Sequence, residues 1–282
     1  MGKLSDAQIA DISASYTAGE STGSLSRRLG VTDASVLYHL KRAGITRRPQ
    51  DTARRVYHIN DGAFDQLTPE TAYWVGFLMA DGCILDESKV QIGLAIIDHG
   101  HLVKLRRFLC TDNRPIYNVS SNGSCALKFH SRQIVSRLAH FGVVPRKSLV
   151  AEAKGDVDSW PTFWLGMIDG DGSLGIYGKT RKSNSQVRLV GTLKMMAQFV
   201  RFMQKAEVKG YRDCSDGVAI HRRKDGLHEV SVGGQRAGNL LRLLYAQDTG
   251  FSLDRKREKA TVLMAHSPAS VVVELPSQGL AS

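Results

Sequence analysis

Apolar residues in the first part of the chain recur with the spacing of α-helices. The pattern predicts three helices, which lie at 4–18, 21–29 and 33–43. Gly19 and Gly44 follow the first and third helices, where glycine commonly ends a helix, and Thr32 is a good N-cap for the third. We therefore expect a small all-α domain over residues 1–48, followed by a basic linker over residues 49–63.

From residue 64 onward, segments with the two-residue alternation of strands are interleaved with segments of helical period. Strands are expected near 90–97, 174–178 and 186–193, and in hairpins around 122–123 and within 218–232. Helices are expected near 101–109, 133–141, 195–206, 236–245 and 253–265. In the first long strand, apolar side chains share one side at Val90, Ile92, Leu94 and Ile96. This mixture predicts an α+β fold, and the patternless residues 267–282 are expected to form a loose tail.

An internal repeat divides this second region into two halves, 64–155 and 156–266. The first copy reads Tyr73-Trp-Val-Gly-Phe-Leu-Met-Ala-Asp81-Gly82, and the second reads Phe163-Trp-Leu-Gly-Met-Ile-Asp-Gly-Asp171-Gly172. The final aspartates are 90 residues apart, and similar predicted elements follow each copy. A single Asp-Gly is ordinary turn chemistry, but two matched copies indicate a shared role.

Each copy carries small residues four positions apart, Gly76 with Ala80 and Gly166 with Gly170. Residues at that spacing lie on one helix face, where small side chains allow two helix backbones to approach closely. We expect the two copies to pack on each other, with both aspartates just past the helix C-termini. Because a helix C-terminus carries a partial negative charge, two carboxylates placed there favour a divalent cation. Oxygen ligands favour Mg²⁺, with Mn²⁺ as an alternative, and such a site suits the hydrolysis of phosphodiesters.

The charge of the chain points to a polyanionic partner. Its net charge is +11, and residues 1–56 hold nine Lys and Arg against five Asp and Glu, while residues 160–266 hold eighteen against ten. Both regions should therefore be attracted to phosphates. No run of about 18 apolar residues and no signal peptide is present, so we expect no membrane partner and a cytoplasmic, nucleoid-associated protein of a bacterial or phage-infected cell. The four scattered cysteines are expected to be core thiols.

Residues 74–82 and 164–172 resemble the two signature motifs of the LAGLIDADG homing endonucleases. The second copy is close to the family pattern, whereas the first has Met79 at the sixth position, where the family usually has Asp. The resemblance covers about residues 64–265. It implies two αββαββα halves related by pseudo-twofold symmetry, with the motif helices at their interface and a saddle of β-strands that lies in the DNA major groove.

The resemblance also assigns residues to the site. It implies Mg²⁺ bound by Asp81 and Asp171, with help from the backbone carbonyls of Ala80 and Gly170. By position, Lys147 and Lys256 match basic residues that the family places near each metal, where they could stabilise charge on phosphorus or orient a water. A plain phosphate contact is the alternative for both lysines. The strand residues that could face DNA, or could be only solvent-exposed, are Lys89, Gln91, Lys128, Gln186 and Arg188.

Residues 25–40 resemble the helix-turn-helix of resolvase- and invertase-type DNA-binding domains. The side chains expected to fill its small core are Leu25, Leu29, Val31, Val36 and Leu40. The third helix would enter the major groove with Ser35, Tyr38 and His39 outward, and Arg47 and Arg48 would follow the backbone or the minor groove. A three-helix bundle with no DNA role is the alternative.

These features and the resemblance predict a monomeric, site-specific endonuclease that hydrolyses double-stranded DNA with a divalent metal, and the resemblance implies that its cuts leave short 3′ overhangs. The N-terminal domain would raise its affinity and lengthen its site. One alternative is a transcription regulator that keeps the LAGLIDADG fold as a binding scaffold, and another is an RNA-splicing maturase. Retention of both Asp81 and Asp171 argues against the regulator, and the DNA-type helix-turn-helix argues against the maturase.

Overall fold

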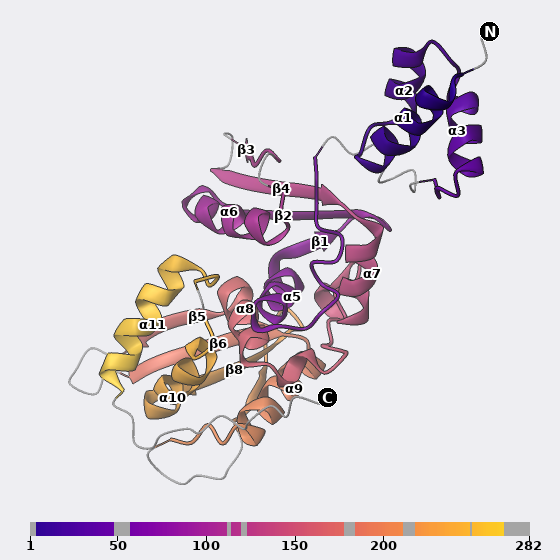
Figure 1. The fold of residues 1–282 in the computed structure, drawn as a ribbon. Helices are drawn as coiled ribbons and strands as arrows, with labels where there is room; N and C mark the ends of the chain where they lie inside the picture. Colours follow the sequence, from indigo (N-terminus) through magenta and orange to yellow (C-terminus); the bar gives the residue numbers. More distant parts are fainter. Residues whose placement is uncertain are drawn as a thin grey trace. The chain divides into compact units, whose positions relative to one another are not determined.

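The computed structural model describes most of the chain in two compact units. The described residues are 4–47, 57–111, 114–119, 123–177, 184–210, 218–248 and 250–267. The chain divides into Met1–His58 and Ile59–Ser282 (Figure 1). Each unit has its own hydrophobic core. Ile59 is only 5% exposed and is buried with Phe64 in the second core. Residues 59–63, which the sequence assigns to a linker, therefore belong to the second unit, while residues 49–56 and the tail beyond residue 267 lie outside the described residues.

The described residues of the first unit contain three short helices, and a hydroxyl side chain caps the start of each. They are α1 (Asp6–Thr17), α2 (Thr22–Leu29) and α3 (Asp33–Arg42). The capping residues Ser5, Ser21 and Thr32 each accept a hydrogen bond from a backbone N–H in the first turn. The expected core residues Leu25, Val36 and Leu40 are fully buried, whereas Leu29 and Val31 are only partly buried. Ile12 and Tyr16 of α1 complete this core.

The second unit repeats one order of elements twice. The first half contains α5 (Pro69–Asp81), β1 (Gly82–Ile84), β2 (Lys89–Ala95), α6 (His99–Phe108), β3 (Tyr117–Val119), β4 (Ser124–His130) and α7 (Arg132–His140). The second half contains α8 (Pro161–Asp171), β5 (Ser173–Tyr177), β6 (Asn184–Gly191), α9 (Leu193–Lys205), β7 (Ile220–Arg222), β8 (His228–Gly233) and α10 (Gly234–Tyr245), and α11 (Asp254–His266) follows it. Short 3-10 helices lie at Ile96–Asp98, Lys147–Leu149 and Val157–Ser159. Each half is thus αββαββα, which confirms the predicted fold class.

Each half contributes a four-stranded antiparallel sheet with one buried face. The strand orders are β1-β2-β4-β3 and β5-β6-β8-β7. In the first sheet, Val90 and Ile92 are buried, α6 packs against β2 and β4, and α7 packs against β2 (Figure 1). In the second sheet, Val187 and Leu189 are buried, and α9 and α10 contact β6 and β8. Because neighbouring strand residues point to opposite faces, Lys89 and Gln91 and their counterparts lie on the open face of the sheet.

The first long strand is shorter than its alternation predicts. β2 ends at Ala95, which pairs with Ser124, the first residue of β4. The backbone N–H of Ile96 still donates to the Gly123 carbonyl at 2.8 Å, but the chain turns there into the 3-10 helix Ile96–Asp98, where Ile96 is exposed rather than on the buried face. The prediction for Ile96 was wrong because the backbone leaves the strand conformation at this residue although the apolar alternation continues.

Two of the cysteines also differ from the prediction. Cys83 and Cys110 are exposed, and only Cys125 is a core thiol, while Cys214 lies outside the described residues. Cys83 is exposed because it falls on the open face of β1, opposite Gln91. Among the helices that the structure describes, none is both long enough and apolar enough to cross a bilayer.

Candidate functional site

The motif helices α5 and α8 pack against each other at their glycines. A Cβ added at Gly76 would lie 2.0 Å from the backbone oxygen of Phe163, and one at Gly166 would lie 2.1 Å from that of Tyr73. One at Gly170 would lie 2.3 Å from the Cβ of Ala80. Such distances leave no room for a side chain, so the close approach expected from the small residues is present.

This packing brings the two motif aspartates to the same end of the helix pair. Asp81 and Asp171 are the last residues of α5 and α8, inside the helices rather than past them. Desolvation by the surrounding protein atoms, followed by the negative charge of Asp171, raises the pKa of Asp81 to about 6. Desolvation also raises the pKa of Asp171 above its ordinary value. The two carboxylates therefore form a site at which negative charge accumulates.

The two predicted basic residues both lie against the C-terminal ends of these helices. The Nζ of Lys147 donates to the backbone oxygen of Gly82, and the Nζ of Lys256 donates to that of Gly172 at 2.7 Å. Lys256 also donates to the carbonyls of Ile168 at 2.6 Å and Asp169 at 2.7 Å. Positive charge there offsets the partial negative charge of each helix end.

The lysines differ in how far solvent reaches them. Lys256 is only 5% exposed, and burial lowers its pKa to about 8. Lys147 is half-buried, and burial lowers its pKa as well. Lys256 is therefore held by the backbone carbonyls at the C-terminal end of α8, whereas Lys147 is more accessible to a bound molecule.

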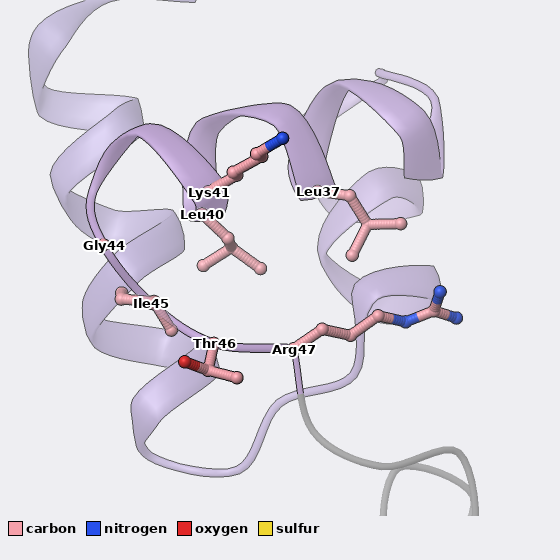
Figure 2. A pocket seen from close by; sticks show the side chains of 7 residues that line it. All are labelled: Leu37, Leu40, Lys41, Gly44, Ile45, Thr46 and Arg47. Carbon is pink, nitrogen blue, oxygen red and sulfur yellow. The ribbon is translucent and has the colours of Figure 1, made fainter.

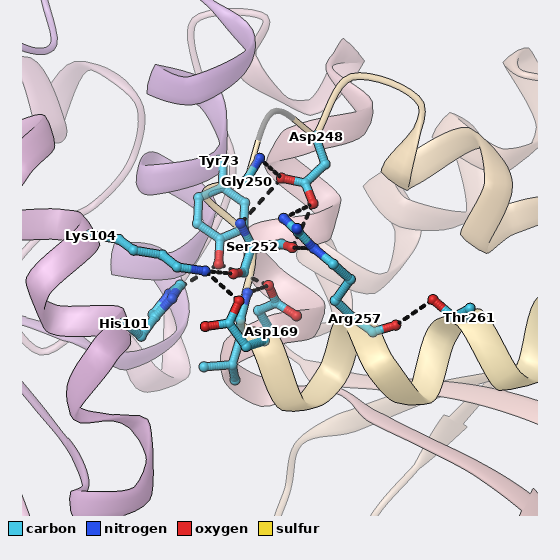
Figure 3. A network of polar contacts seen from close by, with 11 residues as sticks. Tyr73, His101, Lys104, Asp169, Asp248, Gly250, Ser252, Arg257 and Thr261 are labelled. Carbon is cyan, nitrogen blue, oxygen red and sulfur yellow. Dashed lines mark hydrogen bonds and ion pairs between the residues drawn. The ribbon is translucent and has the colours of Figure 1, made fainter.

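The sixth position of the second motif organises a polar network between the halves (Figure 3). The carboxylate of Asp169 accepts hydrogen bonds from the Tyr73 hydroxyl and from the backbone N–H of Leu253, both at 2.8 Å. The Tyr73 hydroxyl also lies 3.0 Å from Nε2 of His101. In the first half, Met79 cannot accept such bonds. Only the second motif therefore holds a helix start in this way, because Leu253 is the residue before α11.

A pair of charges beside Asp81 was not found from the sequence. The guanidinium of Arg255 donates to both carboxylate oxygens of Asp98, with Nε–Oδ1 and Nη2–Oδ2 distances of 2.8 and 2.9 Å. Both residues line a hollow of about 260 Å³ that Asp81 and Gly170 also border. The sequence feature that could have pointed to Arg255 is the Arg-Lys pair that occurs at 146–147 and again at 255–256. Nothing in the sequence connects Arg255 with Asp98, because the two are 157 residues apart.

The strand residues proposed to face DNA gather on the open faces of the two sheets. Gln91 pairs with Lys128 across β2 and β4, and Lys89 lies two residues away on the same face. On β6, the Arg188 guanidinium donates to Oε1 of Gln186 at 2.8 and 3.1 Å. These side chains on both sheets are half-buried, so solvent or a bound molecule can still reach their polar groups.

In the first unit, the residues proposed for DNA contact lie on and after α3. Tyr38 is 56% exposed, while Ser35 and His39 are half-buried. Arg47 borders an open hollow that is lined by Leu37 and Leu40 of α3 and by residues 44–47 (Figure 2). Arg48 lies outside the described residues.

The residues present fit a hard divalent cation whose coordination is completed by oxygen atoms of the substrate. The candidate donors are the carboxylates of Asp81 and Asp171 and the carbonyls of Ala80 and Gly170, all of them oxygen. The Gly170 carbonyl is shared, because Lys256 Nζ lies 3.4 Å from it. The described residues contain no cluster of three or more His, Cys, Asp or Glu side chains, so this set lacks the ligands of a closed, all-protein metal cage.

Comparison with known proteins gives a fold match without a sequence match. No family model matches the chain, and no curated protein sequence does. The solved LAGLIDADG homing endonuclease I-GzeII, in complex with its DNA target, is 13% identical with a TM-score of 0.50, and the match covers 71% of this chain and 92% of that one. The LAGLIDADG homing endonuclease I-LtrWI, bound to target DNA, is 10% identical with a TM-score of 0.49, covering 73% and 91%. The chain has the fold of the LAGLIDADG homing endonucleases, as its two motifs predicted.

Proposed function

We propose that this protein is a site-specific endonuclease that cuts double-stranded DNA with the help of a divalent metal. The observation that carries the proposal is the pairing of Asp81 with Asp171 at the ends of two packed helices, in a fold shared with DNA-bound nucleases. A protein that only binds DNA gains nothing from two carboxylates near a phosphate backbone. The net charge of +11 supports the same partner.

Mg²⁺, or Mn²⁺ in its place, would be held by Asp81 and Asp171 together with the carbonyls of Ala80 and Gly170. When bound, the metal would neutralise charge on the phosphodiester and activate a water. Lys147, which is the more accessible lysine, is placed to stabilise negative charge on phosphorus. Lys256 fixes the end of α8 and so positions Asp171 and the Gly170 carbonyl.

The open sheet faces would read the DNA, with Lys89, Gln91 and Lys128 on one half and Gln186 and Arg188 on the other. A β-surface of this kind fits the major groove. One chain supplies both halves, so the protein would act as a monomer and cut both strands, leaving short 3′ overhangs. The first unit would add contacts through Ser35, Tyr38, His39, Arg47 and Arg48.

The test is cleavage of a randomised double-stranded DNA library with Mg²⁺ and with EDTA. Wild type is compared with Asp81→Asn, Asp171→Asn and the control Glu207→Gln, an exposed carboxylate distant in sequence from both motifs. We expect wild type and the control to release ends that share one long sequence, and both aspartate variants and EDTA to abolish cutting. If wild type retains one sequence without cutting it, the enzyme proposal fails and the regulator alternative is favoured. Retention of RNA in place of DNA would favour the maturase.

A further inference from the structure

The Asp98–Arg255 pair joins the two halves beside only one of the two motif aspartates. Asp98 is 7% exposed, and three contacts of 2.8, 2.9 and 3.1 Å from Nε and Nη2 of Arg255 hold its carboxylate. Asp98, Arg255 and Asp81 all line one hollow. The pair therefore lies beside the candidate metal ligand of the first motif.

Arg255 keeps donors that Asp98 does not use. A guanidinium has five N–H donors, and among the described residues Nη1 of Arg255 has no hydrogen-bond acceptor. The Arg255 side chain is 43% exposed, and it borders the hollow of about 260 Å³ that Asp81 and Gly170 also line. An oriented guanidinium with free donors is suited to a phosphate, which it can bind through two parallel hydrogen bonds.

Among the residues that the structure describes, the second motif aspartate has no equivalent pair beside it. β6 passes through the single residue Thr192 into α9, so the second half lacks the 3-10 helix that carries Asp98. Arg146 precedes Lys147 as Arg255 precedes Lys256, but Arg146 is exposed and has a left-handed φ of 55°. Within the described ranges, no carboxylate lies at ion-pair distance from Arg146. The surroundings of Asp81 and Asp171 are thus chemically unequal.

We propose that Arg255, oriented by Asp98, binds a backbone phosphate of the DNA strand that is cut beside Asp81, so that the two strands are held and cut unequally. This inference rests on the proposed endonuclease function. Arg255 is then a catalytic residue of one cleavage centre, contributed by the opposite half of the protein. Asp98 is its positioning residue.

The experiment follows each strand separately. A duplex with the selected target carries a different dye on each 5′ end, and nicking rates are measured with enzyme in excess and Mg²⁺ present. The variants are Arg255→Gln, the double variant Asp98→Asn with Arg255→Gln, and the control Lys205→Gln, which removes an exposed charge at the end of α9. Circular dichroism and thermal unfolding monitor folding, because Arg255→Gln leaves Asp98 buried without its partner.

We expect Arg255→Gln and the double variant to slow one strand by about tenfold or more, and the other strand by less than about threefold. The control should leave both rates unchanged. The double variant separates the two roles, because it removes both charges and leaves no unpaired carboxylate. If it cuts both strands like wild type, the pair only links the halves and the inference is overturned, as it is if both strands slow equally.

A binding measurement separates failure of this inference from failure of the proposed function. Without divalent metal, the slope of log Kd against log salt should fall by about 0.9 in Arg255→Gln and in the double variant, as for one lost phosphate contact, and not in Lys205→Gln. If wild type binds but never cuts, the endonuclease proposal fails while this slope still tests the phosphate contact. An unchanged slope overturns the inference whatever wild type does.

Discussion

Lys147 and Lys256 each follow an arginine in the sequence, yet their surroundings give them different roles. Lys256 is 5% exposed and donates to the carbonyls of Ile168, Asp169 and Gly172 at 2.6 to 2.7 Å. Lys147 is half-buried and donates to the Gly82 carbonyl. A charged donor shared among buried carbonyls satisfies groups that a helix end leaves unpaired. Lys256 should therefore matter for stability as well as for the site.

Replacement of each lysine by methionine tests this difference. We expect Lys256→Met to lower the free energy of unfolding by about 2 to 4 kcal/mol, because the carbonyls of Asp169 and Gly172 lose their lysine donor, while the Ile168 carbonyl keeps only the Gly172 N–H. Lys147→Met should cost about 1 kcal/mol. Urea unfolding followed by tryptophan fluorescence reports on the second unit alone, since all three tryptophans lie there, at 74, 160 and 164. Equal losses in the two variants would contradict the assignment.

His101 makes the stability of the second unit dependent on pH. Burial lowers the pKa of His101 to about 3, below its ordinary value of 6.5. The unfolded chain takes up a proton near pH 6.5 and the folded chain does not, so stability falls as pH drops below that value. Between pH 7 and pH 5, wild type should lose about 1 to 2 kcal/mol more than His101→Gln. Urea unfolding at pH 7, 6 and 5 measures this, and parallel losses would mean that His101 takes up its proton as readily in the folded protein as in the unfolded chain.

At the scale of elements, the α5–α8 interface depends on glycine backbones. A Cβ at Gly166 would meet the Tyr73 oxygen at 2.1 Å, and neither backbone can yield without separating the helices. We expect Gly166→Ala to lower the free energy of unfolding by about 3 kcal/mol or more and to misplace Asp171. Gly100 in α6 is the matched control, because a Cβ there meets nothing within 4 Å. Gly100→Ala should stabilise the protein by about 0.5 to 1 kcal/mol through its helix propensity.

Near-equal changes in the free energy of unfolding for Gly166→Ala and Gly100→Ala would contradict the close packing of α5 and α8. Activity gives a second readout, because Gly166→Ala should reduce cleavage even at temperatures where the protein stays folded. The change acts through the position of Asp171, and a movement of about 1 Å in a catalytic group can cost a hundredfold in rate. Gly100→Ala should leave the cleavage rate unchanged.

Elements whose pattern is local could be predicted from the sequence. The helices and hairpins follow from period and turn residues, and the motif pairing follows from small residues four apart, such as Gly76 and Ala80. The end of β2 could not be predicted, because Ala95 is the last residue with a partner on β4 and that register is set by the tertiary fold. Local pattern specifies what an element is, and the partner element specifies where it stops.

The same distinction applies to the site. Asp81 and Asp171 were identified because each ends a repeated motif, and Lys147 and Lys256 because they match by position the basic residues that the family resemblance implies near each metal. The Asp98–Arg255 pair was missed, since its members are 157 residues apart and only Arg255, in the repeated Arg-Lys, has a counterpart in the other half. Symmetry between the halves is visible in sequence, whereas departures from symmetry need coordinates.

At the scale of the whole molecule, two units with separate cores share one chain. The cores contain no common residue, so the second unit should fold without the first. Residues 1–56 hold nine basic and five acidic residues, and α3 exposes Tyr38 beside Arg42, whose guanidinium lies 5.8 Å from the ring centroid. Tethering such a unit to a nuclease raises the effective concentration of its binding surface.

Removal of residues 1–58 tests what this tether contributes. We expect the shortened protein to bind the selected DNA about 10- to 100-fold more weakly and to have a smaller salt dependence, because it makes fewer phosphate contacts. The positions of its cuts should not change, since Asp81 and Asp171 both remain. Fluorescence anisotropy with the same labelled duplex measures the affinity, and sequencing of the ends locates the cuts.

In the full chain, Tyr38→Ala should reproduce part of the loss of affinity without changing the net charge. If the shortened protein and Tyr38→Ala bind like wild type, the first unit is a helical bundle with no DNA role, and recognition belongs to the two sheets alone.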